Sequence, residues 1–244
     1  MKAIVTGHSR GLGAAMTEDL LSRGASVLGL SRSINEDLQS RHPSLLQQVS
    51  IDMTDPANLI AWLDSGALAG FLENDEPVML VNNAGIVDPI GPAGSLDHNS
   101  IARAVGLNVT APLLLADAFI GATSGNADRR VLHVSSGAGR KPYAGWSIYC
   151  ATKAALDHHA ASVVQDKPAG LRISSVAPGV IDTDMQNTIR STPADRFVLR
   201  DDFVALKETG SLTSPEQRGK EMIAHLLADD FGQSPIVDIR DFAA

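Results

Sequence analysis

The sequence is poor in cysteine, in basic residues and in long apolar stretches, and each shortage excludes a class of protein. A single cysteine, Cys150, excludes an internal disulfide and favours a reducing, cytoplasmic setting. Acidic residues outnumber basic ones and give a formal charge of −8, which argues against a nucleic-acid partner. No apolar run approaches the roughly 20 residues that span a bilayer, and no charged and apolar leader precedes the first predicted strand. We expect a soluble, cytoplasmic protein with neither nucleic-acid nor membrane partners.

Metal-binding and nucleophilic signatures are also missing. His158 and His159 have no cysteine or carboxylate arranged around them at metal-ligand spacing, so no metal is expected. His133 lies inside an apolar run and is interpreted as a core residue. Cys150 would point about 100° away from Tyr149 around a helix, so we interpret it as a packing residue rather than a nucleophile.

What the sequence does contain is the length and composition of one enzyme domain. With 244 residues, of which 44% are hydrophobic and 20% charged, the chain can bury a large core without dividing. It contains no internal repeat and no linker rich in Pro, Gly or Ser. We expect a single domain over residues 1–244.

Short apolar runs alternate with longer amphipathic segments, which predicts an α/β fold of the Rossmann type, a doubly wound parallel sheet with helices on both faces. The predicted strands are residues 2–5, 26–30, 48–51, 78–81, 130–134, 171–176 and 235–238. The predicted helices are residues 12–23, 56–69, 97–121, 147–165 and 215–229, the last opened by Ser214 as N-cap and Pro215. Residues 180–213 have no strong pattern; because ligands bind beyond the carboxyl ends of such strands, we expect this segment to cover the substrate.

A glycine-rich segment follows the first predicted strand. Gly7, Gly11 and Gly13 stand between Thr6 and a helical pattern, where residues without a Cβ permit a tight turn. The amides that open the helix would then face outward, and the partial positive charge of a helix N-terminus attracts a pyrophosphate. This arrangement predicts a dinucleotide ligand.

A serine, a tyrosine and a lysine have the spacing of a proton-transfer site. Ser136 precedes Tyr149 by thirteen residues, and Lys153 follows Tyr149 by four. Residues four apart share one face of a helix, so an ammonium would lie beside a phenol and lower its pKa. Alone, such a pair is also compatible with a solvated helix face. Together with the dinucleotide segment, it favours interconversion of carbonyls and alcohols.

The whole chain resembles the short-chain dehydrogenase/reductase family. Thr6-Gly7-xxx-Gly11-x-Gly13 is similar to the family's cofactor loop, and Asn82-Asn83-Ala84-Gly85 to the motif after its fourth strand. Asn108, Ser136, Tyr149 and Lys153 match its catalytic positions, and Ala177-Pro178-Gly179 with Thr183 resembles its nicotinamide-side loop.

The resemblance implies a role for each catalytic residue. Tyr149 would exchange a proton with the reacting oxygen, and Ser136 would orient that oxygen. Lys153 would tune Tyr149 and hold the nicotinamide ribose, and Asn108 would hold a water that links Lys153 to solvent. The cofactor-binding residues implied are Gly7, Ser9, Arg10, Gly11, Leu12, Gly13, Ser31, Arg32, Asp52, Met53, Asn83, Ala84, Gly85, Tyr149, Lys153, Pro178, Gly179, Val180 and Thr183.

Charges near the adenosine ribose predict NADP(H). Enzymes that prefer NAD place an acidic residue at the end of the second strand, whereas this chain has Ser31 and Arg32 there and adds Arg10 before the second loop glycine. Arginine pairs with phosphate through two parallel hydrogen bonds, which suits a 2′-phosphate. The alternative is that both arginines are solvated surface residues.

The C-terminal third resembles the sepiapterin reductase and benzil reductase branch of the family, on Asp182-Thr183-Asp184-Met185-Gln186, Phe203-x-x-Leu206-Lys207-x-x-Gly210-x-Leu212 and Val237-Asp238. That branch reduces a vicinal diketone or a pterin side chain, and Asp238 resembles the aspartate that anchors the pterin. A solvated surface aspartate is the alternative. The substrate residues expected are Tyr143, Trp146, Met185 and Asp238.

Other functions remain open at this point. A reductase of 3-oxoacyl thioesters, or a sugar or alcohol oxidoreductase, would share every catalytic residue. An extended relative, such as a nucleotide-sugar epimerase, would need a longer substrate domain. A non-catalytic NADP(H) sensor commonly lacks the tyrosine or lysine that this chain retains.

The resemblance also implies a homodimer or homotetramer that packs through residues 97–121 and 147–165. The small residues on these segments would permit close approach either to a symmetry mate or to the sheet: Ala111, Ala116, Ala154, Ala155 and Ala160.

Overall fold

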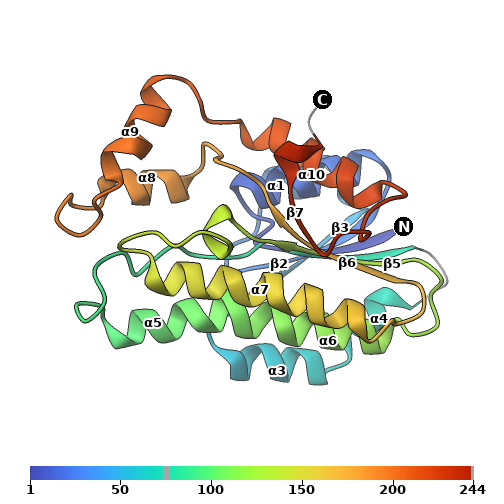
Figure 1. The fold of residues 1–244 in the computed structure, drawn as a ribbon. Helices are drawn as coiled ribbons and strands as arrows, with labels where there is room; N and C mark the ends of the chain where they lie inside the picture. Colours follow the sequence, from blue (N-terminus) through green and yellow to red (C-terminus); the bar gives the residue numbers. More distant parts are fainter. Residues whose placement is uncertain (74–76, 243–244) are drawn as a thin grey trace.

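Seven parallel strands form one sheet in the order β3-β2-β1-β4-β5-β6-β7, as Figure 1 shows. The computed structural model describes residues 1–73 and 77–242. Between β1 and β4 the chain order reverses, which creates the crevice where ligands of doubly wound sheets bind. The strands are β1 Lys2–Thr6, β2 Ser26–Ser31, β3 Leu46–Ser50, β4 Val78–Asn82, β5 Arg129–Val134, β6 Leu171–Ala177 and β7 Ile236–Asp238.

Helices cover both faces of the sheet (Figure 1). On one face α1 and α10 pack closely, because a Cβ at Gly219 of α10 would already lie 2.8 Å from the Cβ of Ala15 in α1. On the other face lie α3, α6 and α7, with buried residues such as Leu59, Phe119 and Ala160 forming a second core. The helices are α1 Gly11–Ser22, α2 Glu36–Arg41, α3 Pro56–Asp64, α4 Ala67–Leu72, α5 His98–Val105, α6 Ala111–Ala122, α7 Ser147–Gln165, α8 Asp184–Ser191, α9 Arg200–Glu208 and α10 Pro215–Leu227.

The α/β fold and all seven strands are confirmed, each within two residues of its predicted ends. The cap of α10 is also confirmed, since the Ser214 side chain accepts a hydrogen bond from the Gln217 amide and Pro215 occupies the first turn. Capping satisfies an amide that would otherwise have no partner, which explains the well-defined start of this helix.

Two predicted helices are interrupted. The segment 56–69 is divided between α3 and α4, because Gly66 adopts a left-handed conformation with φ of +76°. The segment 97–121 contains one π-helical turn, Gly106–Thr110, between α5 and α6. Such single turns often occur at functional sites, and this one carries Asn108.

Three short helices lie where no helix was predicted. These are α2, α8 and α9, of six, eight and nine residues. Each is too short to establish a 3.6-residue pattern in the sequence. In Figure 1, α8 and α9 project together to one side of the sheet, within the segment 180–213 that we expected to cover the substrate.

The continuous helical segment His98–Ala122 is, within the described residues, the one helix that meets the length and composition of a membrane span. Its buried residues pack against the sheet, including Leu115, Ala116 and Phe119, each with 0% exposure. That packing is typical of a core helix of a globular protein. The sequence predicted a helix over nearly the same residues, 97–121, but not the π-helical turn inside it.

Candidate active site

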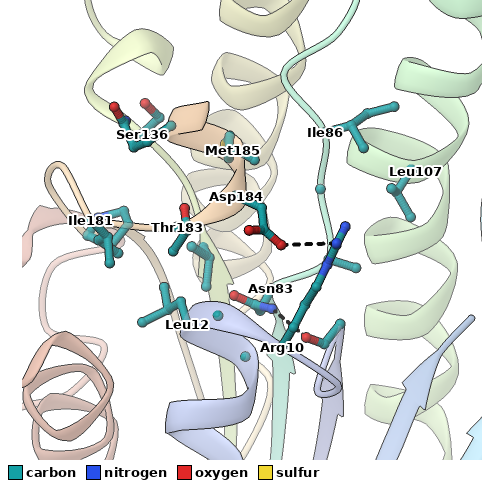
Figure 2. Close-up of a pocket in the computed structure, with 18 of the residues that line it drawn as sticks. Arg10, Leu12, Asn83, Ile86, Leu107, Ser136, Ile181, Thr183, Asp184 and Met185 are labelled. Carbon is teal, nitrogen blue, oxygen red and sulfur yellow. Dashed lines mark hydrogen bonds and ion pairs between the residues drawn. The ribbon is translucent and has the colours of Figure 1, made fainter. Parts of the chain in front are cut away.

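A cavity of about 830 Å³ opens at the carboxyl ends of the central strands. Figure 2 shows its floor at the start of α1, near Leu12, and a facing wall that carries Ile181, Thr183 and Asp184. Of the residues predicted for catalysis, cofactor or substrate, all line this cavity except Asn108 and Asp238. Residues from positions 7 to 240 therefore meet around one space.

The glycine-rich segment makes the tight turn that its sequence predicted. Gly7 and Gly11 have φ of +68° and +54°, a left-handed conformation that favours glycine. Gly13 is required by packing, since a Cβ there would lie 2.1 Å from the Gly7 carbonyl oxygen. Any side chain at Gly13 would thus displace the turn.

The N-terminus of α1 faces the cavity without competing groups. Its N-cap residue, Arg10, makes no capping hydrogen bond through its side chain, and the first turn contains no acidic residue. The amides of a twelve-residue helix start at this point, with the partial positive charge of the helix dipole. A bare, glycine-lined helix start fits the pyrophosphate of a dinucleotide.

The Asn82-Asn83-Ala84-Gly85 motif joins β4 to the turn after β1. The Thr6 hydroxyl accepts hydrogen bonds from the Asn83 and Ala84 amides, both at 2.9 Å, and the Asn83 side chain donates to the Thr6 carbonyl at 2.9 Å. The ends of β1 and β4, which flank the crevice, are therefore held together by Thr6 and by Asn83, which also lines the cavity. This accounts for the presence of the motif.

The end of the cavity where the adenosine is expected carries the predicted positive charge. Ser31, which is 6% exposed, lies at the end of β2 and donates to the Ser33 carbonyl, and Arg32 lies beside it exposed to solvent. Arg32 also acts on Asp52, whose pKa is lowered by a hydrogen bond from the Thr54 amide and, more weakly, by the Arg32 charge. No carboxylate occupies the end of β2.

Arg10 has a partner that the sequence did not suggest. Its guanidinium lies 3.1 Å from the Asp184 carboxylate, as the dashed line in Figure 2 shows. Both side chains are about seven-tenths exposed, at 72% and 68%, so this ion pair contributes little to stability. It spans the opening between the glycine loop and α8, where a phosphate can replace the carboxylate as the partner of Arg10.

Ser136, Tyr149 and Lys153 meet at the centre of the cavity. The Lys153 ammonium is 4% exposed, donates to the Val134 carbonyl at 2.8 Å and lies 5.7 Å from the centroid of the Tyr149 ring. Burial lowers the pKa of Lys153 to about 8, while the Asp157 carboxylate raises it in part. Lys153 therefore carries its charge at neutral pH and begins to lose it near pH 8.

The pKa of Tyr149 is shifted in the direction opposite to the one expected. Burial raises the pKa of Tyr149 to about 12, the hydrogen bond with Ser136 opposes this shift, and the Cys150 thiol adds to it. The Lys153 ammonium donates to the Val134 carbonyl, and desolvation disfavours the phenolate. A phenol with this pKa is protonated at neutral pH.

Asn108 lies behind the cavity rather than in its lining. Its amide oxygen accepts from the Ile86 backbone at 2.9 Å, and its nitrogen donates to the Ile86 carbonyl at 2.8 Å and to Thr152 at 3.2 Å. A Cβ on Gly85 would lie 3.3 Å from the Asn108 oxygen and 3.5 Å from the Lys153 nitrogen. The side chains of Asn108 and Lys153 therefore both lie close to Gly85.

An aromatic wall closes the end of the cavity beyond Tyr149. The chain has only ten aromatic residues in Phe, Tyr and Trp, and five of them gather here. Trp146, 5% exposed, stacks on Phe197 at 4.9 Å and contacts the other three at 5.3 to 5.5 Å between ring centroids. The five are Tyr143, Trp146, Tyr149, Phe197 and Phe203. An apolar or aromatic substrate group suits this end.

Asp238 does not line the cavity. Its carboxylate accepts from the Arg240 guanidinium at 2.8 and 2.7 Å and from the Arg240 amide at 3.0 Å, which lowers the pKa of Asp238. The side chain that lines the cavity is Arg240. Sequence reasoning selected the aspartate because of a resemblance and missed the arginine two residues later.

Other lining residues were also missed, among them Ile34, Ile86, Leu107, Gln186 and Ile189. Most are apolar residues of loops or short helices, where no periodicity marks a residue as cavity-lining. For Ile34 the sequence does offer a signal, since this apolar residue follows Arg32 closely. In the structure its side chain is 59% exposed.

A buried carboxylate supports the catalytic helix from behind. Asp157, one turn after Lys153, is 5% exposed and accepts from Ser175 at 2.7 Å and from Arg140 at 3.1 Å. Arg140 also donates to the Val237 carbonyl at 2.8 Å. This network joins α7, the loop after Ser136, β6 and β7.

The residues interpreted as non-catalytic lie away from the cavity. His133 is fully buried in β5 and 3.1 Å from His159, and its burial lowers its pKa to about 3. The Cys150 thiol approaches the Lys141 carbonyl at 3.9 Å. Among the described residues, no group of three or more His, Cys, Asp or Glu side chains is placed to hold a metal.

Comparison with known proteins gives a consistent set of similarities. The family model described as short chain dehydrogenase matches residues 1–194. The chain is 35% identical to a benzil reductase ((S)-benzoin forming) of Bacillus cereus, over 97% of this chain and 98% of that protein. It is 30% identical to sepiapterin reductase of Mus musculus, over 98% and 96%. A solved structure of a short-chain dehydrogenase/reductase from Burkholderia vietnamiensis is 45% identical, covers 98% of this chain and 97% of that one, and has a TM-score of 0.72.

Proposed function

The chain belongs to the short-chain dehydrogenase family, and from this premise we propose that it is an NADPH-dependent reductase of ketones or vicinal diketones. The observation that carries the proposal is the meeting of Ser136, Tyr149 and Lys153 between a glycine-lined helix start and an aromatic wall. A dinucleotide and a carbonyl compound fit the two ends of the same cavity.

The cofactor would be held along the floor of the cavity. The α1 amides and the Gly7, Gly11 and Gly13 backbone suit the pyrophosphate, because a Cβ at these positions would fill the space or strain the turn. Asp52 and Met53 suit the adenine, and Lys153 suits the nicotinamide ribose. When bound, the cofactor supplies the hydride, and the protein supplies placement and electrostatics.

Tyr149 acts as the general acid in this proposal. Its raised pKa keeps the phenol protonated, so it can donate a proton to the carbonyl oxygen as negative charge develops there. Ser136 orients the same oxygen with its hydroxyl. Lys153 stabilises the phenolate that remains, and we assign to Asn108, which lies behind Gly85, the water that links Lys153 to solvent.

The rate of reduction is expected to fall as the pH rises above about 8. Lys153, with its pKa lowered to about 8, is charged below that pH and neutral above it, and both cofactor binding and phenolate stabilisation need the charge. The measurement is kcat/KM for NADPH between pH 6 and pH 10, since this ratio reports ionisations of the free enzyme. A flat profile across this range would contradict the assignment of Lys153.

Cofactor choice depends on Arg32 and Arg10. A charged hydrogen bond contributes about 1.5 to 3 kcal/mol, so Arg32→Ala should lower kcat/KM for NADPH by about tenfold or more. The value for NADH should change little, because NADH lacks the 2′-phosphate. A matched control is Arg103→Ala, an exposed arginine outside the large cavity. Equal Michaelis constants of the wild type for NADPH and NADH would overturn the preference.

The substrate end favours an aryl or otherwise planar carbonyl compound. Trp146, Phe203 and Met185 line it, and the relatives named above reduce benzil or sepiapterin. The test is initial velocity with NADPH against benzil, sepiapterin, an acetoacetyl thioester and a simple aldehyde. Fast turnover of the thioester alone would favour the 3-oxoacyl reductase instead, and NADPH binding without any turnover would favour a cofactor sensor.

We further propose a cytoplasmic homodimer or homotetramer that associates through α5, α6 and α7. Ala111, Ala116 and Ala160 are 3%, 0% and 0% exposed and serve the core of one chain. Ala154 and Ala155 are only partly buried and remain available to a second copy. Light scattering on the purified protein gives the mass; a monomer would overturn this assignment.

A further inference from the structure

We propose that Arg240 is a specificity-determining residue that donates a hydrogen bond to a second, neutral oxo group of the substrate. The inference rests on the proposed carbonyl reduction and narrows its substrate to dicarbonyl compounds. Arg240 is one of four cationic residues that line the cavity. Arg10 and Arg32 belong to the adenosine end and Lys153 to the catalytic centre, which leaves Arg240 as the cation of the remaining end.

Contacts place Arg240 beside the substrate rather than the adenosine. A Cβ on Gly179 would lie 3.4 Å from Cδ of Arg240, so the aliphatic part of the arginine side chain packs against the loop after β6. Tyr143, of the aromatic wall, is close enough to act on the pKa of Arg240. Arg240 thus stands between the Gly179 loop and the aromatic wall, at the end of the cavity where the carbonyl compound is expected.

The guanidinium is fixed and still has free donors. Asp238 accepts from its Nε and Nη2 atoms at 2.8 and 2.7 Å, and this bidentate pairing sets the plane of the group. The Asp238 side chain is 16% exposed, whereas that of Arg240 is 61% exposed. A guanidinium has five N–H donors, so Nη1, which is not engaged by Asp238, can donate to a ligand.

Hydrogen bonds connect the backbone beside the Asp238–Arg240 pair to the helix α7. Arg140 donates to the carbonyl of Val237, the residue before Asp238, and is itself paired with the buried Asp157 of α7. The position of Arg240 relative to Tyr149 and Lys153 is therefore set through a polar network rather than by a free chain end. Pre-organised donors of this kind lose little entropy when they bind.

The charge around Arg240 favours a neutral oxygen over a carboxylate. Asp238 neutralises the guanidinium, and the Asp241 carboxylate also acts on it. The Arg140 charge is in turn paired with Asp157. With the positive charge compensated, Nη1 provides a directed hydrogen bond but little ionic attraction, which suits the second oxo group of a diketone.

The test compares three substrates that share a benzoyl group. Benzil has a second neutral oxo group, deoxybenzoin has none, and phenylglyoxylate has a carboxylate in its place. Arg240→Met should lower kcat/KM for benzil by about threefold to tenfold, as expected for one hydrogen bond to a neutral oxygen, and leave kcat/KM for deoxybenzoin unchanged. Asp238→Asn, which removes the ionic pairing of the guanidinium, should give a smaller loss for benzil, mainly in KM.

A matched control is Arg23→Met, because Arg23 forms a similar half-exposed pair with Asp19 at 2.7 Å and does not line the cavity. Equal losses of kcat/KM for benzil and deoxybenzoin would overturn the role of Arg240. A larger loss for phenylglyoxylate than for benzil would also overturn it, because Arg240 would then recognise an anion rather than a neutral oxo group. If the wild type reduces none of the three, the proposed function fails. Calorimetric binding of benzoin to wild type and Arg240→Met in the presence of NADP⁺ then decides the role of Arg240 separately, since equal dissociation constants would overturn it.

Discussion

A Tyr149→Phe variant is expected to lose carbonyl reduction by about 10³-fold in kcat, the middle of the range for a positioned general acid. In the proposed mechanism the phenol of Tyr149 donates the proton, and its pKa, raised to about 12, keeps it protonated at neutral pH. The ring itself is 7% exposed and packs against Trp146 at 5.4 Å, so phenylalanine preserves the core. NADPH binding, measured by fluorescence titration, should change little because the cofactor loop is untouched.

The neighbouring Cys150→Ser variant provides the control, because Cys150 is on the same helix but approaches the Lys141 carbonyl instead of the cavity. It should retain normal turnover. Normal turnover by Tyr149→Phe would remove Tyr149 from the mechanism, and joint loss of turnover and cofactor affinity would indicate damage to the fold rather than to the proton transfer.

An Asp157→Ala variant is expected to lose about 1 to 3 kcal/mol of unfolding free energy, because the buried Ser175 hydroxyl and the partly exposed Arg140 guanidinium lose a common acceptor. Asp157 is 5% exposed and holds both Arg140 and Ser175, so four elements lose a common contact. Urea unfolding followed by circular dichroism measures the change. Asp37→Ala, at an exposed ion pair with Arg41 on α2, should leave the unfolding midpoint unchanged.

Asp157→Asn separates the electrostatic role from the packing role. Asn keeps the shape of the side chain but removes the negative charge that raises the pKa of Lys153. That pKa should then fall further, and the alkaline decline of kcat/KM for NADPH should begin at a lower pH than in the wild type. An unchanged pH profile in a folded Asp157→Asn protein would contradict the coupling between Asp157 and Lys153.

Much of the fold and of the cavity lining could be predicted because each depends on local signals. The strand that ends in Thr6 is a short apolar run, and the turn at Gly7 and Gly11 depends on residues that tolerate positive φ. The spacing of Tyr149 and Lys153 is a property of one helix, α7, which was predicted with its observed ends. In each case neighbours in the sequence are neighbours in space.

The features that could not be predicted depend on contacts between distant segments. The break at Gly66 interrupts a segment whose residues favour a helix on both sides. The helices α8 and α9 are stabilised by packing on each other and on the apolar residues that line the cavity. The raised pKa of Tyr149 depends on its burial, and the position of the Lys153 ammonium depends on its hydrogen bond to the Val134 carbonyl. Burial and long-range hydrogen bonding are set by tertiary structure, and no spacing in the sequence encodes them.

The pairing of Asp238 with Arg240 illustrates the same limit. A carboxylate near the chain end was a reasonable candidate ligand for the substrate, but the 3₁₀ turn at Ile239–Asp241 folds Arg240 back onto it. Which member of the pair lines the cavity depends on that turn and on the approach of the Gly179 loop.

We propose above all that this protein transfers hydride from NADPH to a carbonyl carbon, with Tyr149 protonating the oxygen. The most direct test of the hydride transfer supplies the wild-type protein with NADPH that carries deuterium in place of both C4 hydrogens of the nicotinamide, together with benzil, and analyses the product by mass spectrometry and proton NMR. We expect benzoin with one deuterium on the carbinol carbon. Benzoin without deuterium at that carbon, or oxidation of NADPH without benzoin, would contradict the proposed function.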